Sequence, residues 1–185
     1  MSGRAPTLLI AAVGIVAVAA AAGLFIWSGT YDIGADVPHA APTHWLLETV
    51  RDRSVAVHAK AIEAPGNLND PTRIATGAGL YAEMCAGCHL APGMEKTEIS
   101  RGLYPPAPEL ARRTDLSAAE EFWTIKHGIK MTAMPAWGRT HSDALIWDMV
   151  AFVRRMPTLD AAHYRATVKA APADHDAMME MSRGG

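Results

Sequence analysis

The two cysteines of this 185-residue chain lie in one pentapeptide, Cys85-Ala86-Gly87-Cys88-His89. Proteins use such a pair in four ways: as a structural disulfide, as a thioredoxin-like redox pair, as half of a zinc site, or as the attachment point of a covalently bound haem. The choice among these four decides what the rest of the chain must fold around.

The surroundings of the pair favour haem attachment. A disulfide across so short a loop stabilises little, a thioredoxin-like pair needs flanking strands that the sequence does not predict, and a zinc site needs a second pair of ligands. Cys-x-x-Cys-His is the attachment signature of c-type haem, in which both thiols bind the vinyl groups and the histidine reaches the iron. Gly77, Tyr81 and Cys85 are four residues apart and therefore share one face of a helix that enters the motif.

An uncharged apolar run from Leu8 to Trp27 precedes all of this. Twenty helical residues rise about 30 Å, which is the thickness of the hydrocarbon core of a bilayer. Arg4 comes before the run and Asp32 and Asp36 follow it, so the positive-inside rule predicts a cytoplasmic N-terminus and an exported remainder. A cleaved signal peptide is the alternative, with a cleavage site among Ala19–Ala22, but the apolar run is long enough to favour an uncleaved anchor.

A helical pattern from Thr43 to Ala64 predicts a juxtamembrane stalk. Thr43 is a suitable N-cap, and Leu46, Val50 and Val57 recur at helical spacing. The stalk is expected to lie outside the globular domain.

The globular domain is predicted to contain three capped helices and no strand. Asp70 is a suitable N-cap before Pro71, and Ser142 begins a last helix that stops at Pro157. Between them, Ser117 and Glu120 form a capping-box pattern and Gly128 ends that helix. The predicted fold class is all-α, with a cytoplasmic N-terminus (1–7), a transmembrane anchor (8–27), a spacer and helical stalk (28–69), a haem domain (70–157) and a weakly ordered tail (158–185).

Four stretches within about residues 70–157 resemble class I monohaem cytochrome c: GAGLYAEMCAGCH, GLYPPAPEL, MPAWG and IWDMVAFVRRMP. The stalk and the tail lie outside this pattern and resemble a membrane-anchored bacterial type. The resemblance implies a small all-α fold around one covalently bound haem c. It also implies that the first and last helices of the domain cross near Gly77, Tyr81 and Phe152.

The resemblance further implies a methionine as second axial ligand, from a loop before the last helix. Met131 and Met134 both lie in that loop, and Met134 is favoured because a proline follows it, as is usual in the family. The expected haem-binding residues are therefore Cys85, Cys88, His89 and Met134, with Met131 as the runner-up for the sixth position.

Several neighbours of these residues are secondary candidates. Pro105 is expected near His89, where a backbone carbonyl orients the imidazole. Candidates for contact with a haem propionate are Arg101, Tyr104, Trp123 and Trp137. Basic side chains around the methionine loop are expected to steer an acidic redox partner; they are Lys126, Lys130 and Arg139.

The expected function is single-electron transfer at the periplasmic side of the inner membrane, without enzymatic turnover or a small-molecule substrate. A quinol-oxidising complex, a terminal oxidase and a periplasmic dehydrogenase are the expected kinds of partner. The net charge of -2 argues against nucleic acid as a partner. Two alternatives remain open: a haem-based gas sensor or weak peroxidase, and a metal-binding accessory subunit that uses histidine and methionine clusters such as His175–Met181.

Overall fold

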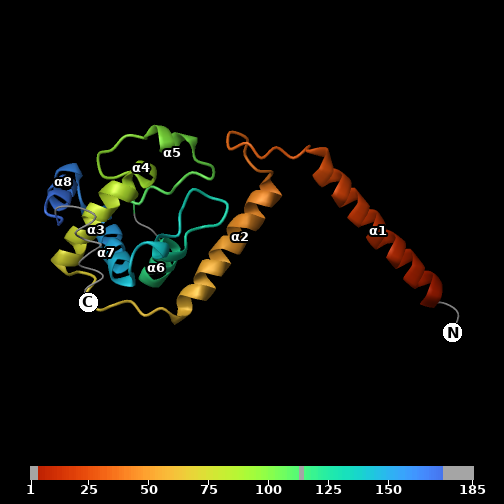
Figure 1. Cartoon of the computed structure of the whole chain (residues 1–185), viewed down its shortest axis with the longest axis horizontal. Helices are drawn as coiled ribbons and strands as arrows, with labels where there is room; N and C mark the ends of the chain where they lie inside the picture. The colour runs from red at the N-terminus through yellow and green to blue at the C-terminus, as the bar shows by residue number, and fades with distance from the viewer. Residues whose placement is uncertain (1–3, 113–114, 173–185) are drawn as a thin grey trace. The chain divides into compact units, whose positions relative to one another are not determined.

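The computed structural model describes residues 4–112 and 115–172 and divides the chain into two units, 1–37 and 38–185 (Figure 1). The first unit contains one helix, α1 (Arg4–Ser28). Its stretch from Pro6 to Ser28 has a mean hydropathy of 2.7 over the most apolar window and buries none of that window within the protein. A helix of this length satisfies its own backbone hydrogen bonds in lipid, so α1 is consistent with single-pass membrane anchoring.

The second unit is helical throughout its described part, and no strand occurs among the described residues of either unit. The all-α prediction is therefore confirmed. The α-helices of this unit are α2 (Ala41–His58), α3 (Pro71–Met84), α4 (Ala86–His89), α5 (Glu98–Gly102), α6 (Ala118–His127), α7 (Asp143–Arg155) and α8 (Ala161–Lys169), with the 3-10 turns η1 (Ala59–Ala61), η2 (Trp137–Arg139) and η3 (Met156–Thr158).

The predicted caps begin three of these helices. The Asp70 carboxylate accepts a hydrogen bond from Thr72 N at 2.7 Å at the start of α3. Ser117 caps α6 in a complete capping box with Glu120, and the Ser142 hydroxyl accepts from the backbone of the first turn of α7. Each cap satisfies amide groups that the first helical turn would otherwise leave without a partner.

The core of the domain is the crossing of α3 and α7. A Cβ atom on Gly77 would lie 2.6 Å from the Asp148 carbonyl carbon, and closer still to the carbonyl oxygen, so only glycine permits this approach. The rings of Tyr81 and Phe152 meet at a centroid distance of 5.3 Å, and both side chains are fully buried. The predicted crossing near Gly77, Tyr81 and Phe152 is confirmed.

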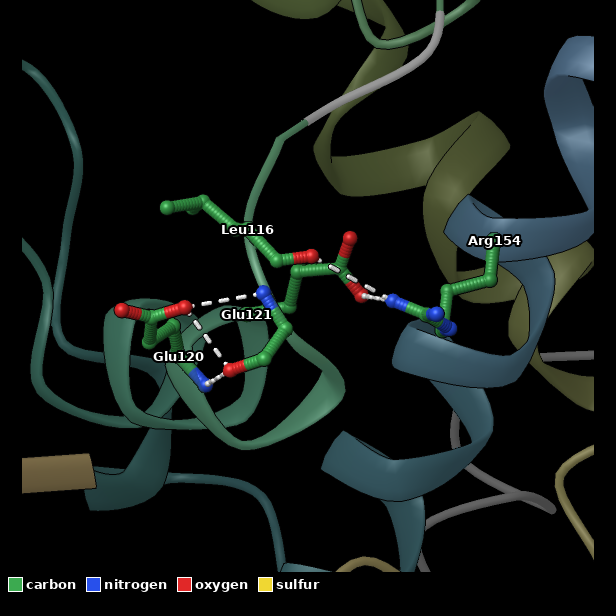
Figure 2. Close-up of polar contacts among 5 residues, drawn as sticks. Leu116, Glu120, Glu121 and Arg154 are labelled. Carbon is green, nitrogen blue, oxygen red and sulfur yellow. Dashed lines mark hydrogen bonds and ion pairs between the residues drawn. The ribbon is translucent and has the colours of Figure 1, made fainter. Parts of the chain in front are cut away.

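An ion pair joins α6 to α7 on another side of the core. Arg154 Nη1 donates to Glu121 Oε2 at 3.2 Å and to the Leu116 carbonyl at 3.4 Å, and Figure 2 shows both contacts converging on one nitrogen of the guanidinium. The Glu121 side chain is only 5% exposed. A carboxylate at this depth needs a cationic partner, so the pair sets the position of α6 on α7.

The stalk differs from its prediction in extent and in packing. Helix α2 begins after Ala40, which makes no side-chain cap, and ends at His58, so Thr43 is not its N-cap. The helix packs against α6 instead of standing apart from the domain. Its packed side carries Val55, whereas the apolar side recognised in the sequence, Leu46, Val50 and Val57, is exposed. Helical spacing shows which apolar residues share a side of the helix, but it does not show which side packs against the domain.

The segment after the domain is not uniformly weakly ordered as predicted. Asp160 caps α8 by accepting from His163 N at 2.8 Å. Tyr164 of α8 is 8% exposed and its ring lies 6.1 Å from that of Phe152. One cap and one buried aromatic side chain are enough to pack this short helix against α3. The histidine and methionine cluster at 175–181 lies outside the described residues.

Candidate haem site

The cysteine motif follows α3 with almost no interruption. Cys85 N still donates to Tyr81 O at 2.9 Å, and Cys88 N and His89 N both donate to Cys85 O, which makes α4 a single turn. The two thiols are half-buried and are not joined in a disulfide. Burial raises the pKa of Cys85 to about 12. A disulfide-exchange pair needs a lowered thiol pKa, so this environment is opposite to that of a thioredoxin-like site.

Tyr81 holds the chain just beyond the motif. Its buried hydroxyl donates to the Leu90 carbonyl, and Leu90 itself has a positive φ of 60°. The residue after His89 is therefore anchored to the last turn of α3. This contact fixes the turn in which His89 sits, because the backbone on both sides of the histidine is held.

The hydrogen bonding of His89 leaves one ring nitrogen available as a ligand. Nδ1 lies 2.8 Å from the Pro108 carbonyl oxygen, and a carbonyl can only accept, so Nδ1 carries the proton. Burial lowers the pKa of His89, against the opposing effect of the Pro108 hydrogen bond. The imidazole is therefore neutral, with a lone pair on Nε2, which is the form that binds metals. The orienting carbonyl belongs to Pro108 and not to Pro105.

The two methionines of the loop after α6 lie in different environments. The Met134 backbone packs on Gly128, where a Cβ atom would come within 2.6 Å of Met134 O. Ile129 N donates to Met134 O at 3.2 Å, and Met134 N donates to the Thr132 hydroxyl at 3.1 Å. Met131, in contrast, is 97% exposed. The loop thus ties Met134 to the end of α6 and leaves Met131 in solvent.

One buried hydroxyl marks the same side of α6. Thr124 Oγ1 is buried and has no hydrogen-bond partner within the described part of the chain. Thr124 lies one turn before Gly128, the residue against which Met134 packs. A buried polar atom of this kind indicates a polar or metal-containing neighbour. The sequence prediction did not include Thr124. The available signal was a hydroxyl residue between the apolar residues Trp123 and Ile125 of α6.

These donors fit the attachment of one haem. Two thiols, a neutral imidazole oriented by a carbonyl and a methionine thioether from a loop are a donor set that suits c-type haem. Within the described residues, no group of three or more His, Cys, Asp or Glu side chains is arranged to hold a metal ion by itself.

Comparison with known families gives the same answer for this region. Residues 72–153 match the family model described as "Cytochrome C oxidase, cbb3-type, subunit III". These residues form a cytochrome c domain. Such a domain implies covalently bound haem c. No curated protein and no solved structure matches the chain.

The other predicted residues are distributed around the cytochrome c domain. The Trp123 ring contacts the rings of His58 and His127, at centroid distances of 5.4 and 5.0 Å. Trp137 meets the ring of His141 edge-on at 5.5 Å, and Arg101 is exposed. The contacts of these aromatic rings are with histidines on the same domain.

The basic side chains near the methionine loop are less available than the sequence suggested. Lys126 Nζ lies 2.7 Å from a carboxylate oxygen of Asp143, which begins α7. Lys130 and Arg139 are exposed. The local positive charge is therefore smaller than a count along the sequence predicts, because a carboxylate from the next helix neutralises one of its three members.

Proposed function

We propose that this protein is a membrane-anchored electron carrier, in which Cys85 and Cys88 bind haem c covalently and His89 and Met134 are the axial ligands. The observation that carries the proposal is the neutral His89, whose Nδ1–H donates to Pro108 O while Met134 is tied to the end of α6. Bound haem c supplies a one-electron couple.

The chain's own residues suit this task in two ways. A thioether ligand favours the reduced state and so raises the reduction potential. The hydrogen bonds of the Met134 loop hold its backbone in place, and ligation of the iron by both His89 and Met134 would leave no site for a substrate. This arrangement supports electron transfer over the sensing of gases or peroxidase chemistry.

The apolar helix supports a role at the membrane. Tethering through α1 would confine the domain to encounters near the bilayer, and the charges around α1 support a periplasmic position of the domain by the positive-inside rule. The name of the matching family, a subunit of a cbb3-type oxidase, supports a terminal oxidase as the electron acceptor. A quinol-oxidising complex or a periplasmic dehydrogenase is then the class of donor.

Substitution of the two loop methionines tests the proposal. Met134→Ala is expected to abolish the thioether-to-iron charge-transfer band of the oxidised protein, to lower the reduction potential and to permit rapid CO binding after reduction. Met131→Ala is the matched control, because that side chain is exposed, and it is expected to keep the band.

Three results would contradict the proposal. Loss of the band in Met131→Ala with retention in Met134→Ala would exchange the two residues. Rapid CO binding by the unmodified reduced protein would support a sensor or peroxidase instead. A chain without covalent haem stain on a denaturing gel would exclude the attachment to Cys85 and Cys88.

A further inference from the structure

The N-terminal half of helix α2 carries four large apolar side chains that the cytochrome c domain does not cover. Trp45, Leu46, Leu47 and Val50 are each more than half exposed. Farther along the same helix Val55 is buried, and α2 packs there against α6. A contiguous apolar group on a surface marks an interaction site, so this half of α2 has a partner other than the domain.

Four exposed residues of α2 lie in one row along the helix. Leu46, Val50, Arg53 and Val57 are spaced four, three and four residues apart, so they share one side. Val57 follows the buried Val55 by two residues, which is about 200° around the helix axis. These four residues, called the outer row below, therefore face away from the domain.

The outer row contains a cation as well as apolar side chains. Arg53 is exposed, and no carboxylate of the described residues pairs with it. Its neighbour Arg51, in contrast, pairs with Asp52 at 2.8 Å. An apolar row with an unpaired guanidinium matches a phospholipid, because acyl chains cover the apolar side chains while a phosphate accepts hydrogen bonds from the guanidinium.

The apolar residues of α2 continue those of the membrane-length helix α1. The segment 29–40 joins the two helices and spans at most about 40 Å when fully extended. Ile33 and Val37 in this segment are exposed apolar residues. Trp45 lies near the start of α2, and tryptophan favours the interface between lipid and water. The chain therefore stays apolar from the anchor into the exposed half of α2.

A link of this length favours the bilayer over a protein as the partner of the outer row. With α1 in the membrane, the bilayer surface is always within reach of α2, so the contact is effectively intramolecular and needs little affinity of its own. A separate protein must first reach the row by diffusion. Link length, apolar side chains and the unpaired arginine thus all point to lipid.

We propose that the outer row of α2 lies in the headgroup region of the bilayer, with its apolar side chains toward the acyl chains and Arg53 on a phospholipid phosphate. The inference rests on the membrane anchorage proposed above. Helix α2 then lies between the bilayer and the cytochrome c domain, because Val55 on its other side is buried. The haem domain is held in one orientation on the membrane and presents a constant face to a membrane-embedded redox partner.

A nitroxide spin label on α2 tests this contact in the full-length, haem-loaded protein, reconstituted in vesicles of phosphatidylethanolamine and phosphatidylglycerol. Haem attachment consumes both native thiols, so an introduced cysteine is the single labelling site, and the unmodified protein is expected to take up no label. Val50→Cys places the label in the outer row. Asp52→Cys is the matched control, because Asp52 is similarly exposed and lies about 200° around the same helix from Val50.

Power saturation compares collisions of the label with oxygen, which concentrates in lipid, and with a water-soluble nickel chelate. Each is measured relative to nitrogen, so that relaxation by the haem iron cancels. The oxygen-to-nickel ratio is expected to be several-fold higher at Val50 than at Asp52. Leu46→Cys, one turn earlier in the row, is expected to give the same high ratio and replaces Val50→Cys if that variant does not accumulate with haem.

Arg53→Gln, added to the Val50→Cys variant, tests the contact with the headgroup. The oxygen-to-nickel ratio at Val50 is expected to fall, because the row loses its hydrogen bonds to the phosphate. An unchanged ratio overturns the part of the proposal that concerns Arg53.

The remaining outcomes decide the proposal as a whole. Equal ratios at Val50 and Asp52 overturn it and leave the row for a protein partner. Dipolar broadening of the Val50 label that grows with the protein-to-lipid ratio shows a second copy on the row and also overturns it. Flotation with the vesicles separates the inference from the anchorage: floating protein with equal ratios overturns the inference alone, whereas protein that does not float overturns both.

Discussion

Replacing Gly77 with alanine perturbs the crossing of α3 and α7 at its closest point. The added Cβ would lie 2.6 Å from the Asp148 carbonyl carbon and 2.9 Å from Phe152 Cβ. Both obstacles are backbone or buried at the root of a side chain, so the clash cannot be relieved by rotating a flexible group. The helices must separate.

The expected cost follows from two opposing effects. Overpacking a well-packed core destabilises by about 1–3 kcal/mol, and this site belongs at the upper end because the neighbour is backbone. Alanine recovers up to about 1 kcal/mol through its better helix propensity. We therefore expect a net loss of about 2 kcal/mol or more in the free energy of unfolding.

Denaturant unfolding of the haem-loaded protein, followed by tryptophan fluorescence, measures this loss. Gly102→Ala is the matched control, because a Cβ there meets nothing within 4 Å, and its stability is expected to be unchanged or slightly increased. A Gly77→Ala variant within about 0.5 kcal/mol of the unmodified protein would refute the reasoning from close approach.

Two further substitutions test other contacts of the core. Tyr81→Phe leaves the buried Leu90 carbonyl without its donor and is expected to cost about 1–3 kcal/mol of unfolding free energy; an unchanged denaturation midpoint would contradict this. Burial raises the pKa of Asp148 to about 6, with Arg73 opposing. Because this pKa exceeds the ordinary aspartate value of 3.8, protonation of Asp148 stabilises the folded state. That stabilisation is fully present below pH 3.8 and is lost as pH rises through about 6. Asp148→Asn is expected to flatten this part of the stability profile, and an unaltered profile counts against it.

The features that sequence reasoning anticipated depend on residues close together in the chain. Asp70, Ser117 and Ser142 begin helices where predicted, because a cap needs only the amides of the next turn. The Cys-x-x-Cys-His motif likewise carries its chemistry in five consecutive residues. The same holds for the apolar run of α1, whose length is a local property.

The features that it missed depend on contacts between distant segments. The acceptor for His89 is the carbonyl of Pro108, and every residue has a carbonyl, so residue identity carries no signal for it. Lys126 looked available until α7 brought Asp143 beside it. Tyr164 packs near Phe152 from a segment whose composition suggested weak order.

Helix α2 illustrates both kinds of information. The sequence by itself determined that a helix forms there and that a membrane-length apolar helix precedes it, since both follow from local spacing and composition. Only the tertiary structure decided that the side with Val55 and Ala59 packs on the domain while Leu46, Val50 and Val57 remain exposed. Spacing reports which residues share a side of a helix, but burial depends on the partner surface, which α6 supplies here.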